Sequence, residues 1–200
     1  MSPSTPEAAD KRHQILQAAV RVFARQGFDG TRMADVAREA GVAYGLVYHY
    51  FGSKDAVLQA VFREAWARLL EAVALAEETG QTAIEQLALV VRIVLRVWRD
   101  EPDLVRLLVR EVTRSPHISE ELEEIGRAFA SLERIIRRGQ EAGTLRPGVD
   151  PRLAAWMLYG ALEEILTGWV LGRLPDDPSA AEAAEREIVA TFVGGLRAAS

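Results

Sequence analysis

The strongest constraint on the fold of this chain is that apolar residues recur at helical spacing in almost every segment. Residues 9–26 show the pattern well, because Ile15, Ala19 and Phe23 fall on one face of a helix and Gly27 ends the run. No segment of four to eight residues alternates between apolar and polar side chains as a half-buried strand does. The sequence therefore predicts an all-α protein of about nine helices.

Glycine, proline and capping residues set the expected limits of these helices. Thr31 and Ser53 are typical N-caps, and the prolines at 102, 116 and 151 stand near helix starts, where the missing N–H costs nothing. The expected helices cover residues 9–26, 32–40, 44–51, 53–78, 82–100, 102–114, 118–142, 151–173 and 179–198. A chain of 200 residues is long enough to bury a core without disulfides, and this one has no cysteine.

Two of the short helices form the most informative pattern. The turn at residues 40–43 joins them through Gly41, which allows the positive φ of such a turn, and this arrangement is typical of a helix-turn-helix. The outward face of the second helix carries Tyr44, Gly45, Tyr48 and His49. Tyrosine and histidine donate hydrogen bonds to phosphates and base edges, and glycine permits a close approach to the groove. Lys54 follows at a helix start, where its ammonium and free backbone N–H groups would hold one phosphate.

Residues 27–58 resemble the DNA-binding domain of the TetR family of bacterial transcriptional regulators. The family pattern T-T-x-x-x-I-A-x-x-A-G-V-S-x-G-x-L-Y-x-Y-F-x-S-K-x-x-L-L is matched at Thr31, Ala37, Ala40, Gly41, Val42, Gly45, Tyr48, Tyr50, Phe51, Ser53, Lys54 and Leu58. Two positions depart from the pattern: Arg32 replaces the second threonine, and Ala43 replaces the serine that caps the recognition helix.

This resemblance implies that the partner is a double-stranded DNA operator. The candidate DNA contacts are Thr31, Arg32, Tyr44, Gly45, Tyr48, His49, Tyr50 and Lys54. Arg32 adds a cation for a phosphate or the minor groove, and Tyr50 is equally compatible with a place in the core. Because of the two departures, the operator sequence cannot be carried over from other members of the family.

The resemblance also divides the chain into a helix-turn-helix domain at residues 1–52 and a ligand-binding and dimerisation domain at residues 53–200. Because the family binds small hydrophobic ligands between helices of the second domain, we expect bulky side chains there to line a cavity. The candidates are Trp98, Leu108, Phe129, Trp156, Met157, Tyr159 and Trp169. The segment 158–164 is similar to family members that sense fatty acyl-CoA. The alternative is a regulator of an efflux or stress gene that senses a lipophilic drug.

The family further implies a homodimer and a repressor that leaves its operator when ligand binds. Small residues on the expected helices 151–173 and 179–198 allow two such helices to approach closely. The bulky neighbours expected to fill that interface are Leu158, Ile165, Val189 and Phe192. The expected helix 53–78 is the route of coupling, because a ligand wedged against its far half would tilt it and misalign the two recognition helices.

The distribution of charge and the motifs in the sequence bear on which other classes of function are possible. Residues 1–55 hold 7 basic and 6 acidic side chains, a net charge of +1, whereas residues 56–200 carry −6, so only the N-terminal part suits a polyanion. The three histidines are too scattered for a metal site, no catalytic motif occurs, and no apolar run is long enough to span a bilayer. We therefore expect a cytoplasmic regulator that has no cofactor and is not an enzyme.

Two charge features have more than one interpretation. Glu163 and Glu164 stand on an otherwise apolar helix, where one of them faces the ligand cavity or an arginine, or both are solvated. Five arginines between residues 92 and 110 either meet an anionic head group or lie on the surface. The sequence leaves both questions open.

Overall fold

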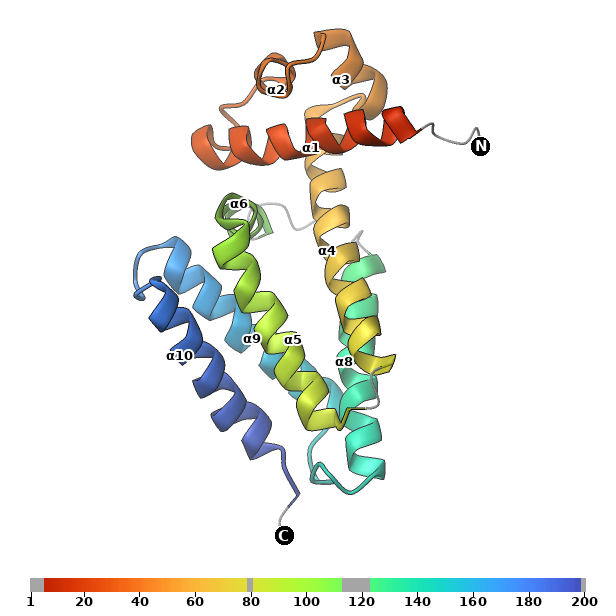
Figure 1. Ribbon diagram of the computed structural model, residues 1–200, viewed down its shortest axis with the longest axis vertical. Helices are drawn as coiled ribbons and strands as arrows, with labels where there is room; N and C mark the ends of the chain where they lie inside the picture. Colours follow the sequence, from red (N-terminus) through yellow and green to blue (C-terminus); the bar gives the residue numbers. More distant parts are fainter. Residues whose placement is uncertain (1–5, 79–80, 113–122, 199–200) are drawn as a thin grey trace.

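The computed structural model confirms the all-α prediction. The structure describes residues 6–78, 81–112 and 123–198. The helices within these residues are α1 (Pro6–Gln26), α2 (Met33–Ala40), α3 (Tyr44–Phe51), α4 (Lys54–Glu78), α5 (Ala83–Asp100), α6 (Pro102–Val112), α8 (Glu123–Glu141), α9 (Pro151–Val170) and α10 (Pro178–Ile188), followed by a π-helical turn at Val189–Val193. Figure 1 shows α1, α2 and α3 as a unit at one end, from which α4 runs into a bundle with the remaining helices.

The three-helix unit owes its geometry to a small core and one left-handed turn. Val36 of α2 and Val47 of α3 are fully buried against α1 and the first half of α4. Gly41 ends α2 with a φ of 64°, and its own N–H and that of Val42 donate back to the last turn of α2. The turn that the sequence predicts is therefore confirmed, and it aims α3 away from the bundle (Figure 1).

Two helices join this unit to the bundle. The first half of α4 buries Leu58 and Phe62 in the core of the three-helix unit, and its second half buries Val73 in the core of the bundle. On α6, Leu104 and Leu107 belong to the first core, and Val105 belongs to the second. A displacement of α4 or α6 therefore changes the packing of both cores.

Some helix limits differ from the prediction. The helix expected at 151–173 ends at Val170, because Gly172 adopts a φ of 64° and the chain turns there. The helix expected at 179–198 changes to the π-helical turn after Ile188. The helix expected from 118 is described from Glu123, and Pro116 lies outside the described residues. As predicted, Ser53 caps α4 by accepting the N–H of Ala56, at 3.1 Å.

Gly139 on α8 gives a prediction about stability. A Cβ added there would lie 2.6 Å from the Cβ of Ala83 and 2.7 Å from a methyl group of the buried Leu145. We expect Gly139→Ala to lower the free energy of unfolding by about 1–3 kcal/mol through overpacking. Gly126→Ala on the same helix meets no atom within 4 Å. It should instead add up to about 1 kcal/mol through helix propensity. Urea unfolding of both variants tests the contrast, and equal midpoints would contradict it.

Candidate DNA interface and ligand cavity

The exposed face of α3 is the candidate DNA-reading surface. Tyr44 is 53% exposed and Tyr48 42% exposed, which is unusual for such large rings, and their centroids lie 5.0 Å apart. The helix is held in place from its other side by Val47, which is fully buried. His49 is exposed beside them, and a Cβ added at Gly45 would meet no atom within 4 Å. The structure thus brings these four candidates together on one open surface.

The two tyrosines interact with each other one helical turn apart. A hydrogen bond with the hydroxyl of Tyr48 is the main cause that raises the pKa of Tyr44, ahead of desolvation and of the charge on Tyr48. The Tyr44 phenol therefore stays protonated at neutral pH. Tyr50 differs from both, because it is half-buried and packs against the core of the three-helix unit with its ring 5.6 Å from that of His49. Its part in DNA contact remains a prediction.

The structure shows contacts of Lys54 and Thr31 inside the fold, and their part in DNA contact remains a prediction. The Lys54 ammonium donates to the carbonyls of Phe28, at 2.7 Å, and Thr31, at 3.1 Å, and lies 4.3 Å from the centre of the Phe28 ring. Thr31 is buried, and its hydroxyl donates to the carbonyl of Gly27 at 2.7 Å, so it does not cap α2. The N-cap is Arg32, whose exposed side chain remains a candidate for phosphate.

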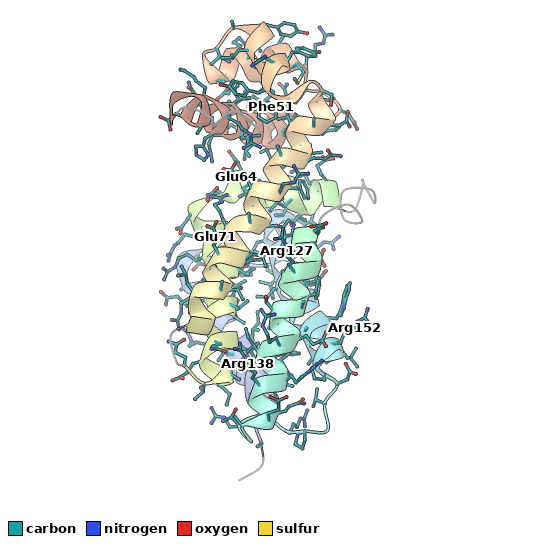
Figure 2. All side chains as sticks on the ribbon, turned by 90° about the vertical axis from the view of Figure 1, so that its right-hand side faces the viewer. Phe51, Glu64, Glu71, Arg127, Arg138 and Arg152 are labelled. Carbon is teal, nitrogen blue, oxygen red and sulfur yellow. The ribbon has the colours of Figure 1, made fainter. Side chains whose placement is uncertain are left out.

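The bundle contains a partly open cavity of about 280 Å³ against the second half of α4. Its walls come from five helices and are mostly aliphatic or aromatic. Among the residues that line it are Trp66, Leu69 and Val73 of α4, Val90 and Val94 of α5, Leu104 and Leu108 of α6, Phe129 and Leu132 of α8, and Tyr159 and Leu166 of α9. Figure 2 looks onto α4 and α8, which lie side by side along one wall.

Three of the seven predicted ligand residues line this cavity, namely Leu108, Phe129 and Tyr159. The other four lie elsewhere. Trp98 and Trp169 stack on each other in the core, with centroids 6.1 Å apart, outside the cavity wall. Trp156 and Met157 of α9 are more than half exposed and do not line the cavity, although the Trp156 ring stacks on that of Phe129 in the cavity wall with centroids 4.3 Å apart. On a helix of 3.6 residues per turn Trp156 stands on the same side as Glu163, two turns earlier, and Met157 stands about 100° away from Trp156, which the apolar character of α9 alone does not reveal.

Two polar pairs interrupt the apolar wall. Arg68 of α4 donates two hydrogen bonds to the carboxylate of Glu101, at 2.7 and 3.2 Å. Tyr159 and Glu163 hydrogen-bond to each other on α9. Burial, then the nearby charge of Glu163, raises the pKa of Tyr159 to about 12.

The pKa of Glu163 is also raised. Burial is the first cause and the charge of Glu164 the second, while the hydrogen bond from Tyr159 opposes them. Of the two acidic neighbours that the sequence leaves ambiguous, Glu163 thus faces the cavity and Glu164 is exposed.

The arginines between residues 92 and 110 lie outside the lining of this cavity. Arg92 pairs with Glu185 at 2.8 Å, and Arg106 pairs with Asp103 at 2.9 Å. Arg92 and Arg106 are thus engaged in surface ion pairs, and none of the five arginines lines the cavity. Along the described residues, no three His, Asp or Glu side chains are placed to hold a metal ion.

Comparison with known proteins connects both sites to one family. Residues 15–61 match the family described as bacterial regulatory proteins, tetR family, and residues 84–190 match the tetracyclin repressor-like C-terminal domain. The chain belongs to the TetR family. The TetR regulator is 31% identical over 163 residues to the fatty acid metabolism regulator protein of Bacillus subtilis. This alignment covers 80% of the present chain and 84% of that protein.

Solved structures extend the similarity to the whole TetR regulator. The fatty acid degradation regulator FadR from Bacillus halodurans is 27% identical, with a TM-score of 0.83 over 99% of this chain and 100% of that one. FadR from Bacillus subtilis in complex with stearoyl-CoA is 28% identical, with a TM-score of 0.79 over 92% and 99%. These relatives are regulators, and this TetR protein is a DNA-binding transcriptional regulator and not an enzyme. None of its described helices is long and apolar enough to cross a membrane.

Proposed function

We propose that this protein is a cytoplasmic repressor that holds its operator as a homodimer and releases it when a long-chain acyl-CoA fills the cavity. The observation that carries the proposal is that the cavity is built against α4, the helix on which the DNA-binding unit stands. Ligand binding and DNA binding therefore share one structural element.

The character of the cavity supports an acyl chain as the ligand. Nearly all of its wall is aliphatic or aromatic, which suits a hydrocarbon tail. A structural relative that aligns over nearly its whole length was solved with stearoyl-CoA, and a sequence relative is named as a regulator of fatty acid metabolism. An acyl group in this protein would lie between α4, α5 and α8.

The coupling runs along α4. This helix has 25 residues and is about 38 Å long, from the three-helix unit at its start to Trp66, Leu69 and Val73 at the cavity wall. Figure 2 places Glu64 on the stretch of α4 between α1 and the bundle, where its carboxylate meets the ring of His13 on α1 at 2.9 Å. A ligand that displaces the far half of α4 also moves α1 and α3. Two recognition helices must stand about one turn of DNA apart, so a shift of a few ångströms misaligns one of them.

Operator release tests the proposal directly. Binding of the dimer to a labelled operator fragment, measured by fluorescence anisotropy, should weaken by roughly 5- to 150-fold when stearoyl-CoA is added. Coenzyme A without an acyl chain is the control and should have no effect, because it leaves the apolar cavity empty. Tight binding of stearoyl-CoA with unchanged operator affinity would refute the mechanism, and stronger operator binding would show co-repression.

One observation favours the alternative ligand, a lipophilic drug. The carboxyl group of Glu163 lies on a wall that also carries the rings of Trp66, Phe129 and Tyr159, and this combination attracts a lipophilic cation. The same anisotropy assay with a lipophilic cationic dye separates the two candidates. Release by the dye and not by stearoyl-CoA would establish the drug-sensing alternative.

The dimer interface is proposed on the outer face of α9. Leu153, Trp156 and Met157 are large apolar side chains that are more than half exposed there, and Gly160 continues the same face with open space around it. Such a patch on a symmetric dimer pairs with its own copy. Of the bulky residues that the sequence suggests for this role, Leu158 is fully buried, whereas Ile165, Val189 and Phe192 are half-buried and stay candidates.

A further inference from the structure

The polar groups on the cavity wall are few enough to be assessed one by one. Arg68 and Glu101 neutralise each other through two hydrogen bonds. The Tyr159 hydroxyl, with a pKa of about 12, carries no charge at neutral pH. Glu163 is the remaining ionisable group in the lining, and its carboxyl accepts a hydrogen bond from the neutral hydroxyl of Tyr159. In the described wall, the Arg68 cation is therefore already paired, and the carboxyl of Glu163 faces the ligand.

We infer that Glu163 selects the head group of the ligand, admitting acyl chains that end in a neutral thioester and excluding free fatty acid anions. This inference rests on the proposed function, because it concerns the ligand of the same cavity. It makes Glu163 a specificity-determining residue and the regulator a sensor of activated acyl chains.

The physical reason is the interaction of two carboxylates in an apolar space. A fatty acid anion beside Glu163 would be repelled in a medium of low dielectric, or one of the two groups would have to take up a proton. A thioester carbonyl has no charge and accepts hydrogen bonds, so it meets no such penalty. Arg68 does not offset the repulsion, since its guanidinium is held by Glu101.

The surroundings of Glu163 support this selection. Its pKa is raised mainly by burial and further by Glu164, which shows that the wall already disfavours one negative charge. A second charge at the same place would be disfavoured more strongly. Tyr159, the hydrogen-bond partner of Glu163, has its ring 6.3 Å from that of Trp66 on α4, so the lining around this pair is aromatic.

The experiment compares three ligands of one chain length by isothermal titration: the free fatty acid, its acyl-CoA and its N-acetylcysteamine thioester. The last of these removes any contribution from the nucleotide. Glu163→Gln keeps the size of the side chain and an acceptor for Tyr159 while removing the charge. Glu164→Gln is the matched control, because it removes the same charge from the exposed neighbouring position. Glu163→Leu provides a second variant, and thermal unfolding confirms that each one is folded.

We expect Glu163→Gln and Glu163→Leu to bind the free acid roughly tenfold more tightly or better, the equivalent of one pKa unit, with both thioesters changed by less than about threefold. Glu164→Gln should behave like the unchanged protein. An unaltered ratio of acid to thioester affinity in both Glu163 variants would overturn the inference. Thioesters that bind but do not release the operator would refute the proposed function and leave the selection standing, whereas no binding of any thioester would refute both.

Discussion

Met157→Glu is expected to convert the dimer into a monomer and to weaken operator binding by about 100-fold or more. In the dimer, binding of one subunit to its half-site holds the other subunit close to the second half-site, and the monomer loses this effect. Met157 is 55% exposed on the outer face of α9, beside Leu153 and Trp156. A glutamate there would stand in a desolvated interface, and the two-fold axis would add a second one from the other subunit. Light scattering at micromolar concentration gives the mass, and anisotropy gives the affinity.

Leu75→Glu is the matched control for this variant. Leu75 is 64% exposed and lies on α4, away from the proposed interface, so the same change of charge should leave the mass and the operator affinity unaltered. A dimeric mass for Met157→Glu would place the interface elsewhere on the molecule.

Lys54→Met should lower the free energy of unfolding by roughly 3 kcal/mol, because charge-assisted hydrogen bonds contribute about 1.5–3 kcal/mol each and two partly buried carbonyls would lose their donor. The Lys54 ammonium ties the loop between α1 and α2 to the start of α4 through the carbonyls of Phe28 and Thr31. Operator binding should fall as a consequence, because this loop positions α2 and α3. Denaturant unfolding measures the first effect.

The salt dependence of operator binding tells a structural role for Lys54 from a phosphate contact. If the ammonium is held inside the fold, the slope of log affinity against log salt stays unchanged in Lys54→Met. Loss of a phosphate contact would instead reduce that slope by about one. Lys11→Met is the control, since Lys11 is the other lysine of the chain and its ammonium donates to Gln14 of its own helix, at 3.3 Å.

The three-helix unit was accessible to sequence reasoning because its determinants are local. Gly41 sets the turn between α2 and α3, and the open positions of α3 follow from the spacing of Val47 and the tyrosines. The internal hydrogen bonds of Lys54 were not accessible, since its partners lie 23 and 26 residues earlier in the chain. A motif shows which residue stands at a position, and long-range packing decides what its side chain contacts.

The cavity was harder to predict for a related reason. On α9 apolar residues occur on every side, so periodicity does not separate Tyr159, which lines the cavity, from Met157, which is more than half exposed. Aromatic size alone favoured Trp98 and Trp169, yet these two fill the core by stacking on each other. The ambiguity between Glu163 and Glu164 is of the same kind, because one residue of offset turns a side chain by about 100° around the helix.

Leu104 of α6 has a consequence for anyone who would redesign this regulator as a biosensor. The same side chain is buried in the core beneath α1 and forms part of the cavity wall. Libraries that vary Leu104 to accommodate new inducers would also change how tightly the regulator holds its operator without ligand. The sensitivity to the inducer and the background expression would therefore change together. Leu132 of α8 touches the cavity from the bundle side and belongs only to the second core. Substitutions at Leu132 can therefore change ligand recognition while the expression level without ligand is preserved.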